Sequence, residues 1–169
     1  MPNSNSVEIL KTQEIEKKLQ RMAYEIHENT YAEKQVILLG IKERGCKLAE
    51  KLLPYLHEIS KDKFILQEIA LDKKDPTKYE FTEGFDSQLM RSKSVVLIDD
   101  VLNTGKTLMY AAAAVMFQHC SGLLTVILVN RRHRLFPVRA DIVGLTLSTT
   151  LKEHIRVDLD SKKMAVYLE

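Results

Sequence analysis

The feature that most constrains this chain is Val95–Ile98, a run of four apolar residues that leads directly into Asp99 and Asp100. A short unbroken apolar run is typical of a strand buried on both faces of a parallel sheet. Two adjacent carboxylates at the end of such a strand are costly to bury without partners. Because ligands bind at the carboxyl ends of strands in open α/β sheets, the segment predicts a binding site as well as a strand.

The next residues, Asn103–Thr107 (NTGKT), open a helix and complete a site of mixed polarity. Gly105 allows backbone N–H groups to turn inward, and Thr104 and Thr107 add hydroxyl groups. A helix N-terminus that begins this way favours an anion. The carboxylates can accept hydrogen bonds from sugar hydroxyls, and the helix start can donate hydrogen bonds to a phosphate. A ribose 5-phosphate requires both kinds of partner.

Two other interpretations of this segment have to be weighed. The end of the motif is similar to a Walker A loop, but that loop needs glycine where this chain has Asp100. The plainer alternative is a capped helix after an ordinary turn, with the aspartates as turn formers. The coincidence of so many polar requirements favours the sugar-phosphate site.

A helix is predicted from Thr12, which is a candidate N-cap residue. Its apolar residues recur at helical spacing in one stripe, and three basic residues lie off the stripe and are expected to face water. The stripe is Ile15, Leu19, Met22 and Ile26, and the basic residues are Lys17, Lys18 and Arg21. Residues 1–8 are polar and are expected to be frayed.

Strand and helix patterns then alternate, which predicts an α/β fold with a mainly parallel sheet flanked by helices in a single domain, residues 1–169. Strands are predicted at 36–40, 64–70, 95–98, 123–129 and 142–143, helices around Leu48–Leu56 and after Thr104, and a hairpin at 155–168. Residues 72–92 are polar, contain Pro76 and Gly84, and are predicted to form a flexible functional loop or hairpin.

Composition excludes several classes of protein. The chain has 25 basic and 23 acidic residues, a net charge of +2 that indicates neither a nucleic-acid binder nor a membrane-surface protein. Cys46 and Cys120 lie far apart and lack metal-ligand spacing. Without a signal-peptide pattern or a membrane-spanning apolar run, the expected location is the cytoplasm.

The stretch IDDVLNTGKT resembles the signature of type I phosphoribosyltransferases, which bind 5-phosphoribosyl 1-diphosphate (PRPP). Two further stretches, GIKERG at 40–45 and HRLFPVRADIVG at 133–144, are similar to the bifunctional pyrimidine-operon attenuation regulators that are also uracil phosphoribosyltransferases. The similarity covers about residues 9–168. It implies the type I phosphoribosyltransferase fold, with about five parallel strands and a small hood formed by about 143–169 with contributions from the N-terminus.

The resemblance also implies roles for individual residues. Asp99 and Asp100 would bind the ribose hydroxyls, and Lys42 and Arg44 would stabilise the charge that grows on the leaving pyrophosphate. The predicted donor-binding residues are Gly40, Ile41, Lys42, Glu43, Arg44, Gly45, Asp99, Asp100, Val101, Leu102, Asn103, Thr104, Gly105, Lys106 and Thr107. Mg²⁺ is the implied cofactor, held mainly by substrate and water with no firm protein ligand.

The implied acceptor is a nucleobase, most simply uracil. Hypoxanthine–guanine relatives usually carry an aspartate where this chain has Asn103, which cannot act as a general base at neutral pH, although a purine acceptor stays open. The candidate base-binding residues are Val143, Gly144, Arg134 and Arg139. The segment within 72–92 would close over the site, but its Leu71–Pro76 and the later Ser148–Thr150 depart from the family pattern.

Two competing functions remain open. One is RNA binding by a pyrimidine-operon regulator, which members of the resembled family perform partly through the first helix. Arg21 of that helix is present in this chain. Tyr24 replaces a usual histidine, however, and Glu14 and Glu16 reduce the positive charge of the helix. The other is nucleotide sensing without catalysis. The densest basic cluster, Arg131–Arg134, fits a solvated loop, active-site charge or an RNA surface. The resemblance also suggests a homo-oligomer, a dimer or higher.

Overall fold

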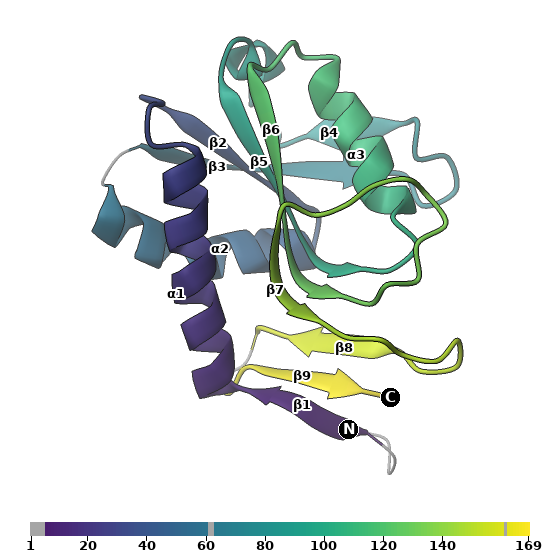
Figure 1. The fold of residues 1–169 in the computed structure, drawn as a ribbon. Coiled ribbons are helices and arrows are strands. Elements are labelled where there is room, and N and C mark those ends of the chain that lie inside the picture. The colour runs from purple at the N-terminus through teal and green to yellow at the C-terminus, as the bar shows by residue number, and fades with distance from the viewer. Residues whose placement is uncertain (1–5, 61–62, 161) are drawn as a thin grey trace.

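The computed structural model describes residues 6–60, 63–160 and 162–169, and forms two sheets with helices (Figure 1). The elements in chain order are β1 (Val7–Lys11), α1 (Thr12–Asn29), β2 (Val36–Ile41), α2 (Arg44–Ile59), β3 (Phe64–Leu71), β4 (Tyr79–Phe81), the 3₁₀ helix η1 (Ser87–Met90), β5 (Ser94–Leu102), α3 (Lys106–Met116), β6 (Gly122–Asn130), β7 (Ile142–Thr146), β8 (Ile155–Asp158) and β9 (Ala165–Leu168).

The large sheet has the strand order β4-β3-β2-β5-β6-β7, and all neighbours are parallel except β3 and β4. The small sheet has the order β1-β9-β8 and is antiparallel. This arrangement confirms the predicted fold class. β7 belongs to the large sheet, so of the segment predicted for the hood, about 143–169, only β8 and β9 lie in the small sheet, together with β1 from the N-terminus.

Apolar residues on both faces of the central strands explain why the large sheet is covered on both sides. Along β2, Val36 and Leu38 pack into the core under α1 and α2, whereas Ile37 and Leu39 pack into the core under α3. Figure 1 shows α1 and α2 on one side of the sheet and α3 on the other. Parallel strands covered by helices bring the carboxyl ends of β2, β5 and β6 to one edge.

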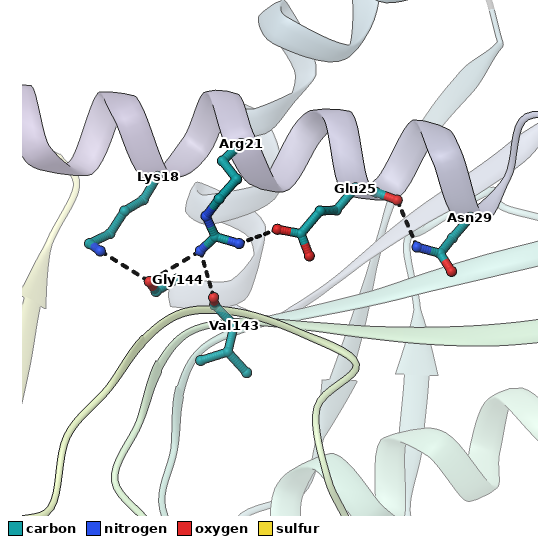
Figure 2. A network of polar contacts seen from close by, with 6 residues as sticks. All are labelled: Lys18, Arg21, Glu25, Asn29, Val143 and Gly144. Atoms are coloured by element: carbon teal, nitrogen blue, oxygen red, sulfur yellow. Dashed lines mark hydrogen bonds and ion pairs between the residues drawn. The ribbon is translucent and has the colours of Figure 1, made fainter.

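Helix α1 holds the free edge of β7, as Figure 2 shows. The Arg21 guanidinium donates to the carbonyl of Val143 at 2.7 Å and to that of Gly144 at 3.2 Å, and Lys18 Nζ donates to Gly144 at 3.1 Å. Arg21 also pairs with Glu25. The predicted apolar stripe of α1 is buried, as expected, and Arg21 is exposed, but Arg21 and the half-buried Lys18 also bond to β7, which was not predicted.

Two further predictions about local structure are corrected, and a third is narrowed to one of its alternatives. The segment expected to be frayed, residues 1–8, overlaps the start of β1, where Val7 pairs with Leu168, while residues 1–5 lie outside the described chain. Helix α1 is capped at Lys11, whose N–H donates to Glu14 at 2.9 Å, because the Thr12 hydroxyl donates instead to the Met164 carbonyl. Residues 72–92 contain β4 and η1, so the hairpin alternative describes them better than an irregular loop.

The contact between α1 and β7 generates a stability prediction. A Cβ on Gly144 would lie 2.6 Å from the Leu128 carbonyl oxygen and 3.2 Å from Met22 Sδ. Gly144→Ala should therefore lower the free energy of unfolding by about 1–3 kcal/mol, measured by urea denaturation. Gly122→Ala is the matched control, because its nearest neighbour would lie at 3.4 Å, and an equal loss in both variants would contradict the packing argument.

Candidate active site

The two aspartates lie near the carboxyl end of β5, which continues past the predicted strand to Leu102. Asp100 is 6% exposed, and its Oδ1 accepts a hydrogen bond from the Val101 N–H at 2.8 Å. Asp100 Oδ2 is buried without a hydrogen-bond partner in the described chain, and Arg44 Nη1 lies 3.7 Å away. This oxygen is a free acceptor held beside one cation.

Burial sets the protonation of this pair. Burial raises the pKa of Asp99 to about 8, and the adjacent Asp100 carboxylate adds to the effect. The pKa of Asp100 is also raised by burial, with Arg44 opposing the shift. Removing a carboxylate from water favours its neutral form. The ionised pair is therefore destabilised at this strand end, and a ligand with hydroxyl donors or a cation would stabilise it.

The loop Gly40–Gly45 lies next to the aspartates because its glycines allow close approach. A Cβ on Gly45 would lie 2.4 Å from the Ile98 carbonyl oxygen, and one on Gly40 would lie 2.6 Å from Cys46 Cα. Lys42 and Arg44 are exposed at the tip of the loop. Two cations therefore face the end of the sheet beside β5.

Residues Val101–Leu108 wrap, with Asp99, around a hollow of about 50 Å³ at the start of α3. Gly105 is the N-cap of the helix, with a φ of 85° that favours glycine. The Thr104 carbonyl accepts hydrogen bonds from the N–H groups of Leu135 and Phe136, so the segment after β6 supports the loop from behind. The Lys106 N–H donates to Thr104 Oγ1 at 3.3 Å, and the N–H groups that follow it at the start of the helix lack partners within the helix and can bind an anion.

Two larger cavities lie at the same end of the large sheet, and one of them contains Asp100. One of about 570 Å³ lies between the start of α2 and the small sheet, and its lining includes Arg44, Asp100 and Arg156. The ion pair of Lys47 with Asp160 connects α2 to the residues after β8 beside this cavity. Another of about 460 Å³ lies at the carboxyl end of β6 and is lined by Asn103, Thr104, Arg131, Arg132, His133, Arg134, Leu135, Leu151 and His154.

A third cavity, of about 290 Å³, gathers three lysines from separate segments. Lys42 comes from the loop after β2, Lys106 from the start of α3, and Lys73 from the turn between β3 and β4. The Asp72 carboxylate accepts from the N–H groups of Lys74 and Asp75, both at 2.8 Å, and these bonds lower the pKa of Asp72. Nothing in the sequence marks Lys73 as a site residue, because only the folded turn brings it beside the other two lysines.

The candidate base-binding residues are placed in different regions. Arg134 lines the cavity that contains Asn103, whereas Arg139 does not. Val143 and Gly144 lie on β7 and give their carbonyl groups to α1, as Figure 2 shows, and they line neither that cavity nor the one with Asp100. The basic cluster Arg131–Arg134 is visible in the sequence, but which of its side chains are buried and which line the cavity is known only from the fold.

Arg131 is 5% exposed and connects two segments of the chain. Its guanidinium donates to Thr149 Oγ1 at 3.1 Å and to the Glu153 carbonyl at 2.5 Å, and His133 Nε2 lies 2.6 Å from the Thr149 carbonyl oxygen. These contacts hold the segment between β7 and β8 over the end of β6. A burial pattern could not have revealed them, because arginine is usually exposed.

In the described part of the chain, no group of three or more His, Cys, Asp or Glu residues is arranged to hold a metal ion. No helix there combines the length and the apolar character needed to cross a bilayer.

Residues 5–162 match the family model for the phosphoribosyl transferase domain, so the chain belongs to the phosphoribosyltransferase family. It is similar to the bifunctional protein PyrR of Haemophilus ducreyi, at 35% identity over 88% of this chain and 87% of that protein. The bifunctional protein PyrR of Bacillus pumilus is 34% identical over 90% of this chain and 89% of its own length. The predicted family is confirmed, and the enzyme class is that of phosphoribosyltransferases.

Solved structures share the fold at lower sequence identity. The hypoxanthine phosphoribosyltransferase of Trypanosoma cruzi superposes with a TM-score of 0.78 at 16% identity, covering 94% of each chain. A hypoxanthine-guanine phosphoribosyltransferase from Bacillus anthracis gives a TM-score of 0.71 at 15% identity, covering 83% of this chain and 82% of its own. These similarities concern the fold alone.

The raised pKa of Asp99 generates a prediction about stability. An unfolded aspartate titrates near 4, so between about pH 4 and 8 the folded chain holds a proton that the unfolded chain has lost. The stabilisation from that proton is complete below about pH 4 and is lost as pH rises to about 8. Asp99→Asn, which needs no proton, should therefore become progressively more stable than the unsubstituted chain, by up to about 1.4 kcal/mol per pH unit.

Thermal and urea denaturation from pH 5 to 9 measures this difference. Glu80→Gln is the control, because Glu80 is exposed on β4. A stability difference for Asp99→Asn that stays constant across this range would show that burial does not hold a proton on the pair.

Proposed function

We propose that this protein transfers the 5-phosphoribosyl group of PRPP to a nucleobase, uracil in the simplest case, and releases pyrophosphate. The observation that carries the proposal is the juxtaposition of Asp99 and Asp100 with the hollow of Val101–Leu108 and the loop Gly40–Gly45. Together these groups match the three charged or polar parts of the donor, which are the ribose hydroxyls, the 5-phosphate and the pyrophosphate.

Each part of the donor has a partner of suitable chemistry. The two carboxylates accept hydrogen bonds from the ribose hydroxyls, and the N-terminus of α3 with Thr104 and Thr107 binds the 5-phosphate. Lys42 and Arg44 stabilise the pyrophosphate, on which negative charge grows as the bond to ribose C1 breaks. The cavity of about 570 Å³ beside Arg44 provides room for that group.

The order of the strands supports a position for the acceptor. The pyrophosphate loop follows β2, the aspartates lie on β5, and β6 is the next strand on the opposite side of β5. A base nitrogen that attacks ribose C1 as pyrophosphate departs must approach from the side away from the leaving group. That side is the carboxyl end of β6, where the cavity of about 460 Å³ contains Asn103 and Arg131–Leu135.

Magnesium fits this site as a partner of the donor. Asp100 Oδ2, buried without a hydrogen bond, is a carboxylate oxygen of the kind Mg²⁺ prefers, and it would hold the ion together with donor oxygens and water. When bound, the ion would supply positive charge that neutralises the pyrophosphate. Arg44 shares this task, and Asp99 and Asp100 keep the ribose oriented. Asn103 cannot take a proton from the base, so the proton passes to solvent.

Uracil is supported by the resemblance of the chain to the bifunctional pyrimidine-operon regulators and by Asn103. Hypoxanthine or guanine is the alternative acceptor. RNA binding through α1 gains no support, because the Arg21 guanidinium is engaged with Glu25 and two backbone carbonyl groups.

The test is pyrophosphate release with PRPP, Mg²⁺ and, separately, uracil, hypoxanthine, guanine, adenine or xanthine. We expect release with uracil, and Asp99→Asn combined with Asp100→Asn should abolish donor binding in titration calorimetry while the circular dichroism spectrum is unchanged. Glu28→Gln on α1 is the control, because it is exposed far along the helix from the site. Unchanged donor affinity in the double variant would remove the proposal, and release with a purine alone would overturn the choice of uracil.

The three-lysine cavity predicts a role for the turn between β3 and β4. Lys73→Ala should raise the KM for PRPP about tenfold, the effect of losing one charge-assisted contact to a phosphate, with a smaller change in kcat. The adjacent Lys74→Ala is the matched control, because Lys74 is exposed and does not line the cavity. Equal effects of both substitutions on the KM would indicate only a general loss of positive charge.

A further inference from the structure

The acceptor cavity at the end of β6 has an unbalanced charge. Its lining holds three arginines and two histidines and no carboxylate. A neutral base such as uracil needs hydrogen-bond partners but gains nothing from net positive charge. A cavity that keeps several cations together without a counterion favours an anionic occupant.

The hydrogen bonds of these arginines do not neutralise them. Arg134 Nη1 donates to the Val138 carbonyl at 3.3 Å, and Arg131 donates to a hydroxyl and two carbonyl groups, all of which are uncharged partners. Glu153 is the acidic group near Arg131, but its carboxylate accepts from the Thr150 N–H at 2.5 Å and does not line the cavity. At most one of the three positive charges is therefore offset.

Arg132 is held in an uncommon backbone conformation at this point. Its φ is 59°, in the left-handed region that residues other than glycine rarely adopt, and its N–H donates to Asn130 Oδ1 at 3.1 Å. The side chain is exposed at the cavity and makes no hydrogen bond or ion pair with the described residues. The strained turn thus presents an unpaired guanidinium to the space for the acceptor.

The 5-phosphate of the donor does not account for these cations. It is served by the N-terminus of α3 and the hollow of Val101–Leu108, which shares only Asn103 and Thr104 with the acceptor cavity. An anionic acceptor also suits Asn103, because a guanidinium, and not a general base, is then the group that stabilises the negative charge of the base.

We propose that the acceptor cavity accommodates a nucleobase that carries a negative charge, such as a pyrimidinedione with a ring carboxylate, and that such a base is used more efficiently than neutral uracil. This inference rests on the proposed function. In the reaction the base nitrogen forms a bond to ribose C1, the bond from C1 to pyrophosphate breaks, and the N–H proton goes to solvent. The carboxylate stays unchanged and pairs with Arg132.

The experiment compares three acceptors in the pyrophosphate-release assay with PRPP and Mg²⁺. Orotate is uracil with a carboxylate at C6, and orotamide has nearly the same shape without the charge. We expect the kcat/KM for orotate to exceed those for uracil and orotamide at least tenfold. Arg132→Gln should lower the kcat/KM for orotate about tenfold or more and should remove most of the advantage of orotate over orotamide.

Arg91→Gln is the matched control, since Arg91 is exposed after η1 and lines none of the cavities at the site. Release with uracil but none with orotate would overturn this inference and leave the proposed function standing. Equal use of orotate and orotamide would also overturn it, because shape and not charge would then govern acceptance. No release with any base would overturn both.

Discussion

The electrostatic cost of two carboxylates at the end of a buried strand organises the rest of this structure. Asp99 and Asp100 follow four fully buried apolar residues, and their surroundings provide two backbone N–H groups and one arginine where water would otherwise solvate them. That compensation is incomplete, as the buried, unpartnered oxygen of Asp100 shows. A site of this kind is preorganised for a ligand and is less stable without it, which is the usual relation between function and stability in enzymes.

The neighbouring elements can be understood as supports for that pair. Gly45 at the start of α2 lets that loop approach the backbone of β5, and the segment after β6 holds the loop before α3 through the Thr104 carbonyl. Arg131 then holds the segment between β7 and β8 over the end of β6. The segments that line the cavities are therefore held in place by hydrogen bonds between residues that lie far apart in the sequence.

The strand end, loop and helix start of the proposed donor site could be predicted from the sequence because their determinants are local. A strand, two aspartates and a helix start occupy fourteen consecutive residues, Val95–Leu108, so the order of residue types specifies the arrangement. The acceptor side could not be predicted in the same way. The roles of Lys73, Arg131 and Arg132 depend on contacts between separate segments, and the start of α1 differs from the prediction because Met164, far along the chain, takes the Thr12 hydroxyl.

The small sheet has a consequence for how the chain acquires its structure. Its central strand β9 pairs with β1 in a register that joins Val7 to Leu168, so the contact has almost the greatest sequence separation available in the molecule. Closing so long a loop lowers the entropy of the chain before the contacts that offset this loss have formed, so such pairings form slowly. On the ribosome, β1 has no partner until β9 has been synthesised. The large parallel sheet can therefore assemble first, and the wall that the small sheet adds beside Arg44 and Asp100 is completed last.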